Sequence, residues 1–321
     1  MRTPSPPPVH AAGRPVTLAV IGDVHDQWTA DDPHILAALG VDGMLFVGDF
    51  GNEAVPVVAA IASLLLPKAV VLGNHDAWFT ATEWGRAKCP YDRAREDRLL
   101  AQLAYLGADH VGYGYRNFPT LGLSVVGGRP CSWGGSDWRH GSFYQQYFGV
   151  DSLATSAERI DEAARQATGE TLVFLNHNGP LGLGDAPQSP CGRDWNPIGA
   201  DFGDPDLAIA LAHTRQRGRP AALVVFGHMH RQLRQNLGQR QMLLVDAMGT
   251  VYLNAAVVPR IRLGPTGPEH HMALVTLAAG RVTEARFVWC SPQGRILTEE
   301  TLYTRPAEAA ADWRTEVLAT G

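Results

Sequence analysis

The feature that most constrains this fold is a series of short apolar runs, each of which stops at a glycine or a polar residue. They cover residues 16–21, 44–47, 69–72, 121–126, 171–175 and 221–226. Runs this short and nearly continuous in apolar residues are typical of strands in sheets that are covered on both faces. Stretches with a helical pattern lie between them, at residues 32–39, 53–65, 92–106, 154–167 and 204–217. The alternation predicts an α/β fold.

The pattern changes after Met242, where strands follow one another with turns between them. These strands are predicted at residues 242–246, 250–255, 272–277 and 282–289, with Gly280 and Arg281 marking a hairpin turn between the last two. A helix predicted at 306–318 would dock on the fold. The chain has no internal repeat and no convincing linker, so residues 16–321 are predicted to form one domain, preceded by a disordered, proline-rich arm at 1–15.

Charge and cysteine content exclude several kinds of protein. The 321 residues carry a net charge of −5, so no overall positive field favours nucleic acid. The four cysteines lie far apart, which argues against a disulfide framework and against a thiolate zinc site. No apolar run approaches the roughly 20 residues that cross a membrane. We therefore expect a cytoplasmic protein with reduced cysteines and without a nucleic-acid or membrane partner.

Residues of metal-ligand type lie just past the ends of five predicted strands. In chain order they are Asp23 and His25, Asp49, Asn74 and His75, His177, and His228 and His230. Ligands bind at the carboxyl ends of strands in open α/β sheets. Asp-x-His and His-x-His place two side chains on the same side of an extended segment, and the preceding glycines allow sharp turns and close approach. Imidazole and carboxylate together suit divalent manganese, iron, zinc or nickel.

Each of these signals is weak when it is taken alone. An aspartate after a strand is usually a cap or a turn residue, and a single histidine at a strand end is usually structural. The set is informative because every member follows its own strand, in order along the chain. The absence of cysteine ligands favours a catalytic site, which keeps positions open for water and substrate.

The ordered blocks resemble those of the calcineurin-like metallophosphoesterase superfamily. That pattern is Asp-x-His, Gly-Asp, Gly-Asn-His-Asp/Glu, His and Gly-His-x-His, and all five blocks occur here between Asp23 and His230. The resemblance implies a four-layer α/β sandwich with two mixed β-sheets flanked by helices. The strands after Met242 would complete the second sheet.

The resemblance is also informative where it departs from known branches. The arginine that binds phosphate in the Ser/Thr protein phosphatases is missing after Asp49, and the chain lacks the extra regions of the double-strand-break nucleases. Residues 176–180 and 252–260 are similar to a little-characterised branch seen in cyanobacteria and plants, which supplies no substrate.

The resemblance implies a role for each ligand-type residue. Asp23, His25 and His230 would hold one metal ion, Asn74, His177 and His228 would hold the other, and Asp49 would bridge both. His75 would not bind metal but would donate a proton to the leaving group or stabilise the phosphoryl oxygens. Two cations about 3.5–4 Å apart polarise the phosphoryl oxygens and lower the pKa of a bridging water toward neutrality. The resulting hydroxide would attack phosphorus in line.

Other residues near these blocks have open interpretations. Asp26 and Asp76 follow ligand blocks and would either orient His25 or His75 or serve as turn and cap residues. A basic rim surrounds His228 in the sequence, formed by Arg215, Arg217, Arg219, Arg231, Arg234 and Arg240. Arg231 is the best substrate contact among them, followed by three arginines of two long loops, Arg129, Arg139 and Arg193; the alternative is solvated surface. Trp133, Trp138, Tyr144 and Phe148, in the aromatic loop 127–149, would pack as a small core, cover a substrate or form a dimer contact.

The sequence thus predicts a dinuclear, metal-dependent enzyme that hydrolyses a small phosphate monoester or diester. A non-enzymatic, metal-binding scaffold on the same fold is the main alternative, and an enzyme acting on a non-phosphate ester or anhydride is a further one. The sequence does not predict the native metal, the physiological substrate or the oligomeric state.

Overall fold

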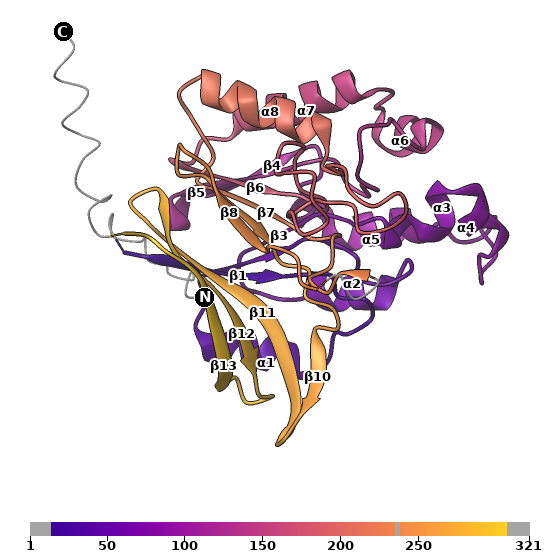
Figure 1. Ribbon diagram of the computed structural model, residues 1–321. Coiled ribbons are helices and arrows are strands. Elements are labelled where there is room, and N and C mark those ends of the chain that lie inside the picture. The colour runs from indigo at the N-terminus through magenta and orange to yellow at the C-terminus, as the bar shows by residue number, and fades with distance from the viewer. Residues whose placement is uncertain (1–13, 235–237, 307–321) are drawn as a thin grey trace, which may run out of the picture.

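The computed structural model describes residues 14–234 and 238–306. The predicted arm before residue 14 and the predicted helix after residue 306 lie outside these residues. Two β-sheets form the centre of the fold (Figure 1). The seven-stranded sheet has the order β13-β12-β11-β1-β2-β3, with β10 beside β11. The six-stranded sheet has the order β4-β5-β6-β7-β9-β8.

Both sheets are mixed, as predicted. The first contains β1 (Val16–Ile21), β2 (Gly43–Phe46), β3 (Lys68–Val70), β10 (Ile261–Gly264), β11 (Gly267–Ala278), β12 (Arg281–Cys290) and β13 (Ile296–Thr304). The second contains β4 (Tyr115–Phe118), β5 (Leu123–Gly127), β6 (Thr171–Leu175), β7 (Leu223–Phe226), β8 (Leu243–Val245) and β9 (Val251–Asn254). The strands β1-β2-β3 and β5-β6-β7-β9 run parallel, whereas the other pairs are antiparallel.

Helices cover the outer face of each sheet, which gives four layers. The helices α7 (Leu153–Gln166) and α8 (Pro205–Gln216) lie side by side over the six-stranded sheet (Figure 1). The core on the outer face of the seven-stranded sheet includes residues of α1 (Asp31–Leu39), α2 (Val55–Ala62), α5 (Arg98–Leu106) and α6 (Gly141–Phe148). Two short helices, α3 (Trp78–Ala81) and α4 (Glu83–Ala87), follow β3 and project from the body. The four-layer α/β sandwich is confirmed.

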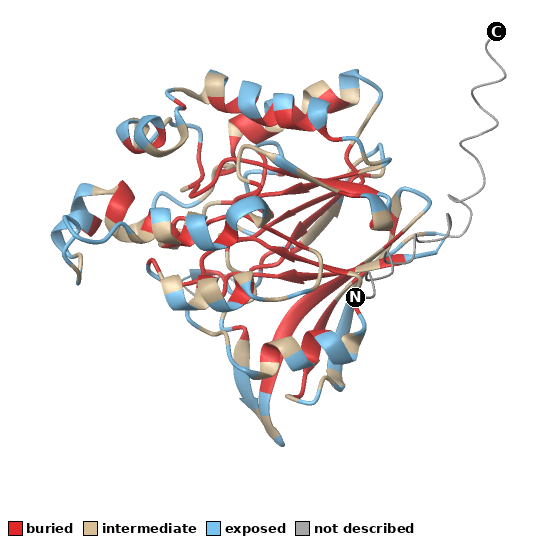
Figure 2. Ribbon diagram, turned by 180° about the vertical axis from the view of Figure 1, so that it is seen from behind, coloured by how far each residue is buried: buried red, intermediate tan, exposed pale blue. Residues whose placement is uncertain are grey.

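Successive side chains of each central strand point alternately to the two faces of its sheet, so each sheet contributes to an apolar cluster on both faces. Leu18 and Val20 belong to the apolar cluster between the two sheets, whereas Ala19 and Ile21 belong to the cluster under the outer helices. Successive side chains of a strand point to opposite faces, so a strand that is apolar throughout is buried on both. Figure 2 shows the central strands as buried over most of their length. The rigid centre fixes where the strand ends lie.

Several local predictions were wrong. The strands at 272–277 and 282–289 are β11 and β12, which join the first sheet beside β1 and not the second; only β8 and β9 complete the second. The strands β4, β10 and β13 were missed because they carry many exposed polar residues, as edge positions permit. The helix expected from residue 92 begins at Arg98, because Asp97 caps it by accepting the Leu100 N–H at 2.9 Å.

The turn between β11 and β12 lies one residue earlier than predicted. Ala279 and Gly280 form it, with φ values of 48° and 75°. Two central residues with positive φ are typical of the tight hairpin turns that fit the twist of the strands. Among the residues described, no helix is long and apolar enough to cross a membrane.

A buried ion pair between Arg260 and Asp32 should make stability depend on acid. Arg260 Nη2 lies 2.7 Å from Asp32 Oδ1, and His270 Nδ1 lies 3.2 Å from the same oxygen. Burial opposes the shift, but these partners lower the pKa of Asp32 from 3.8 to about 2. A depressed carboxyl pKa stabilises the fold above the unfolded value, and this contribution disappears as the pH falls through the folded value.

We therefore expect Asp32 to contribute about 2 kcal/mol above pH ~4 and to lose this contribution between pH ~4 and ~2. Urea unfolding of wild type and Asp32→Asn at pH ~6 and ~3 measures this contribution, with Asp185→Asn as the control for an exposed carboxylate. An Asp32→Asn protein whose unfolding free energy falls with acid as steeply as that of the wild type would contradict the expectation.

Candidate metal centre

The loops that follow five parallel strands bring all eight ligand-type residues to one end of the two sheets. Asp23 and His25 follow β1, Asp49 follows β2, and Asn74 and His75 follow β3. His177 follows β6, and His228 and His230 follow β7. The strands of the two sheets end close together because the sheets pack face to face, so five separate segments meet there.

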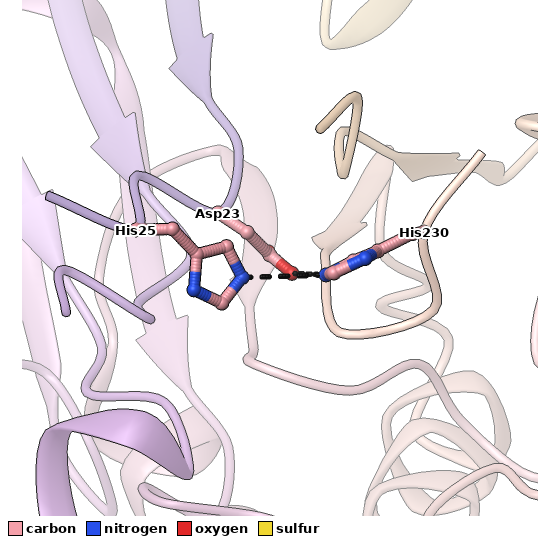
Figure 3. Close-up of side chains that lie close together, drawn as sticks. All are labelled: Asp23, His25 and His230. Carbon is pink, nitrogen blue, oxygen red and sulfur yellow. Dashed lines mark hydrogen bonds and ion pairs between the residues drawn. The ribbon is translucent and has the colours of Figure 1, made fainter. Parts of the chain in front are cut away.

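One group of donor atoms consists of Asp23, His25 and His230. Their ligand atoms lie within 4.8 Å of one another. His230 Nε2 is 3.2 Å from Asp23 Oδ2 and 3.3 Å from His25 Nε2. Figure 3 shows the three side chains pointing toward one another from two loops. Burial opposes both shifts, but the contact raises the pKa of His230 and lowers that of Asp23, so Asp23 is a carboxylate.

A second group is deeper and consists of Asp49, His177 and His228, whose ligand atoms also lie within 4.8 Å of one another. Asn74 belongs to it as well, since its Oδ1 lies 2.9 Å from His177 Nε2. Burial and the neighbouring His177 lower the pKa of His228 to about 3, so this imidazole is neutral and offers a lone pair. The backbone N–H of His228 donates to both Asp23 oxygens at 3.0 and 3.1 Å, which ties the two groups together.

His177 provides the test of whether a cation fits. Its Nδ1 lies 2.8 Å from the Val47 carbonyl oxygen, which can only accept, so Nδ1 carries a proton and Nε2 is the nitrogen that a neutral ring offers as a lone pair. That lone pair faces Asn74 Oδ1 at 2.9 Å and Asp49 Oδ1 at 3.3 Å. For a neutral His177 ring, three acceptor atoms converge at this point. A divalent cation satisfies this arrangement, and the fixed second nitrogen is what metal-bound histidines require.

Asp49 lies between the two groups. Its Oδ1 is on the side of His177, whereas its Oδ2 is 3.8 Å from His25 Nε2. The side chain is 2 % exposed. A buried carboxylate with one oxygen toward each group is the arrangement that a bridging ligand needs.

The backbone at the ligands themselves makes the sharp turns that sequence reasoning assigned to glycines. His25, Asp49 and His228 have φ values of 44°, 54° and 66°, in the left-handed region that costs about 1–2 kcal/mol for most residues. Gly48 is also left-handed, with φ 98°, but Gly73 is not. The strained ligand residues are held by the strands before them and the packing around them.

Gly73 provides space rather than a turn. A Cβ at this position would lie 2.5 Å from both the Asp49 nitrogen and His177 Cε1, and closer still to the Asp49 carboxylate. We expect Gly73→Ala to displace Asp49 or His177 and to lower kcat/KM about 10²-fold, since a displacement of about 1 Å is enough for that loss. The matched control is Gly114→Ala, where the nearest heavy atom lies 3.6 Å away. A Gly73→Ala enzyme that is folded and as active as Gly114→Ala would contradict the expectation.

The carboxylates of Asp76 and Asp26 do not contact the side chains that they were expected to orient. Asp76 is buried and accepts the backbone N–H groups of Asp49, Phe50 and Gly73 at 2.9, 2.9 and 2.7 Å. It therefore joins the loops after β2 and β3 and positions Asp49. Asp26 is exposed in a turn, and its side chain makes no hydrogen bond to any described residue. The prediction that Asp26 and Asp76 orient His25 or His75 is therefore wrong, whereas the alternative of a turn residue fits Asp26.

His75 is held by two residues that sequence reasoning missed. Its Nδ1 lies 2.6 Å from Asn52 Oδ1, and its ring stacks on Trp78 with centroids 4.4 Å apart and an interplanar angle of 13°. Its backbone N–H donates to Asp49 Oδ1 at 2.8 Å. Burial lowers the pKa of His75. The position of Asn52 in Gly-Asp-Phe-Gly-Asn was the available signal, since an amide three residues after Asp49 lies in the same loop.

The structure divides the four arginines expected to contact substrate. Arg139 and Arg193 line a cavity of about 380 Å³ that includes Asp49, Asn74 and His75. Arg129 is buried and pairs with Asp204 at 2.8 Å and Asp206 at 3.2 Å. Arg231 pairs with both oxygens of Glu300 at 2.7 and 3.0 Å and lines a different cavity. The latter two do not line the cavity at the metal centre, because carboxylates elsewhere in the fold bind them.

The aromatic loop 127–149 divides its side chains between the apolar core and the cavity at the metal centre. Tyr144 is buried in the core under α6, and Trp138 and Phe148 pack against the same cluster. Trp133 instead lines the cavity and stacks on Trp78, with centroids 5.4 Å apart. The helix α6 in this stretch was not predicted, since it follows His140 without a side-chain cap. The dimer interpretation stays a prediction.

A family model named calcineurin-like phosphoesterase matches residues 16–232. The chain belongs to this family. The match spans every ligand-type residue of the centre. The protein is therefore a phosphate-ester hydrolase of a metal-dependent family, and its donor clusters are where metal could bind.

Several proteins of known structure are similar to this chain at low sequence identity. A Thermus thermophilus protein is 13% identical, with 82% of this chain and 98% of that chain covered and a TM-score of 0.46. A dimetal phosphatase from Danio rerio is 14% identical, with 90% and 99% covered and a TM-score of 0.46. An archaeal phosphodiesterase is 10% identical, with 85% and 99% covered and a TM-score of 0.35. No curated protein matches the chain. Membership of the calcineurin-like family therefore depends on the family model and not on these distant likenesses.

Proposed function

We propose that this protein is a dinuclear phosphoesterase that hydrolyses a small phosphate monoester or diester. The observation that carries the proposal is Asp49, whose two oxygens face separate donor groups. Asp23, His25 and His230 would hold one divalent ion, and Asn74, His177 and His228 would hold the other. Bound there, the two ions would neutralise charge on the phosphoryl oxygens and lower the pKa of a coordinated water.

The residues of the chain itself position the phosphate ester and move a proton. His75 lies at the cavity beside the ligands, and Trp78 and Asn52 fix its ring. Since Asn52 Oδ1 can only accept, Nδ1 of His75 carries a proton. A proton for the leaving oxygen would come from Nε2 of the doubly protonated ring, because the neutral ring with its proton on Nδ1 has only a lone pair there. Asp49 accepts the backbone N–H of His75 and therefore couples the placement of this histidine to the metal ligands.

The experiment that tests the proposal is hydrolysis of para-nitrophenyl phosphate and of its bis-ester, with manganese, iron, zinc or nickel added to chelator-treated protein. Turnover that requires metal is the expected result, and the preferred ester decides between phosphatase and phosphodiesterase. Two bound metal equivalents without turnover of either ester or of a broad phosphate-ester panel would contradict the proposal. The cytoplasmic location expected from the sequence stays a prediction.

A further inference from the structure

The cavity beside the metal centre is lined by several arginines in addition to the residues of metal-ligand type. Its volume of about 380 Å³ lies in the range of pockets that hold whole small molecules. Arg139, Arg193 and Arg234 line it, each from a different loop, together with Arg240. Asp49 and Asp194 are the acidic residues among the described residues of its lining.

Arg193 has an unused hydrogen-bond donor. Its Nη2 donates to the Gly199 carbonyl at 2.9 Å. Its Nε is buried and has no hydrogen-bond partner among the described residues. Arg193 also lines the cavity, and no carboxylate among the described residues pairs with its guanidinium.

Aromatic rings contact the guanidinium groups of Arg139 and Arg234. Arg234 lies 5.4 Å from the ring centre of Trp195 and has no carboxylate partner among the described residues. Arg139 lies 5.6 Å from the ring centre of Phe202, and the carboxylate near it is the exposed Asp137 at 3.6 Å. Such contacts orient a guanidinium and leave its N–H groups available.

Asp194 does not balance this charge. It is buried, accepts the Arg234 backbone N–H at 2.9 Å and lies 3.7 Å from Arg240. The Asp194 carboxylate thus fixes the backbone of Arg234 and faces the guanidinium of Arg240. The cavity wall beyond the metal ligands therefore keeps a surplus of positive charge.

We propose that Arg139, Arg193 and Arg234 bind a second phosphate group, so that the substrate is a small molecule bearing a phosphate besides the one that is hydrolysed. The inference rests on the proposed function, because the ligands of the metal centre are assigned to the reacting phosphate. Guanidinium groups match phosphate in charge and in the spacing of their donors. The cavity is larger than one phosphate group. Its three guanidinium groups could therefore bind a second anionic group at a distance from the phosphate that is hydrolysed.

The test compares fructose bisphosphate and adenosine bisphosphate, each with its monophosphate, by phosphate release from the metal-loaded enzyme. For at least one pair we expect kcat/KM to be tenfold or more higher for the bisphosphate, since hydrogen bonds to charged groups are the strong ones. In the double variant Arg193→Gln/Arg234→Gln this preference should fall to about one, while kcat/KM for para-nitrophenyl phosphate changes less than about threefold. Arg165→Gln, which removes one charge from an exposed part of α7, should keep the preference.

Two results would overturn the inference. One is the absence of a bisphosphate preference in the wild type for both pairs. The other is an equal loss of kcat/KM for para-nitrophenyl phosphate in the double variant, which would place the arginines on the reacting phosphate.

Calorimetry with inorganic phosphate and metal-free protein separates this inference from the proposed function. Binding that the double variant loses supports the second subsite even if no ester is hydrolysed. Binding that the double variant retains, or no binding at millimolar phosphate, counts against the subsite even if para-nitrophenyl phosphate is turned over.

Discussion

Replacing Asp49 by asparagine is expected to remove metal binding and to lower kcat/KM by about 10³-fold or more. The amide keeps the size of the side chain and an oxygen that can accept the His75 N–H. It cannot supply two anionic oxygens, one toward His177 and one toward His25, as the wild-type geometry does. Two metal ions together account for several kcal/mol of charge stabilisation in such sites, so the loss should be large.

Thermal unfolding with and without manganese shows whether the lost activity comes from lost metal. A ligand that binds only the folded state raises its stability by an amount that grows with the ratio of ligand concentration to Kd. The Tm of the wild type should therefore rise on adding metal, whereas that of Asp49→Asn should not. Asp31→Asn, a partly exposed carboxylate on α1, is the matched control and should behave as the wild type. Two metal equivalents bound by Asp49→Asn would show that Asp49 is not the bridge.

The metal centre was predictable because its residues follow the most regular part of the chain. Strands such as β1 and β6 are buried on both faces, so their sequences are nearly continuous in apolar residues and their ends are visible. A polar residue directly after such a strand has its place fixed by the sheet. The same reasoning failed for β13, whose exposed edge carries polar side chains at successive positions.

The partners of the arginines could not be predicted, because they depend on contacts between distant segments. Arg129 lies in a long loop beside aromatic residues, as a substrate contact would, but it pairs with Asp204, which is 75 residues away in the chain. Arg139, in the same loop, lines the cavity. The difference comes from how the loop turns between them, with Gly134 and Gly135 both at positive φ, and spacing alone does not encode that path.

The surroundings of the aromatic side chains in this loop could not be predicted from their spacing either. Trp133 and Trp138 lie five residues apart in one loop, but the first faces the cavity and the second packs on the core. Stacking on Trp78, which itself stacks on His75, links Trp133 to the catalytic side of the cavity. Neither contact was visible in the sequence, because the short helix α3 that presents Trp78 has no strong start signal.

The replacement His75→Ala should leave metal content unchanged and lower kcat for an alkyl phosphate by about 10²–10⁴-fold, the usual contribution of a positioned acid. The His75 ring contributes no ligand atom to either of the two metal groups; its Nδ1 is bonded to Asn52, and its ring packs edge-on against that of His25, with centroids 4.9 Å apart. The expectation for para-nitrophenyl phosphate differs, because nitrophenolate leaves readily without a proton. If His75 protonates the leaving oxygen, its loss should therefore cost much less with this substrate than with β-glycerophosphate.

The comparison of the two substrates decides between the two roles open to His75. An equal loss of kcat for both would mean that the ring stabilises phosphoryl oxygens, since that charge develops whichever group leaves. His75→Gln keeps a donor at a similar distance and should recover activity only in the second case. Loss of metal from His75→Ala would instead make His75 a ligand, which the short spacing of His25, Asp49 and His75 permits geometrically. Metal content measured beside the two rates thus separates proton donation, phosphoryl stabilisation and metal binding in one set of variants.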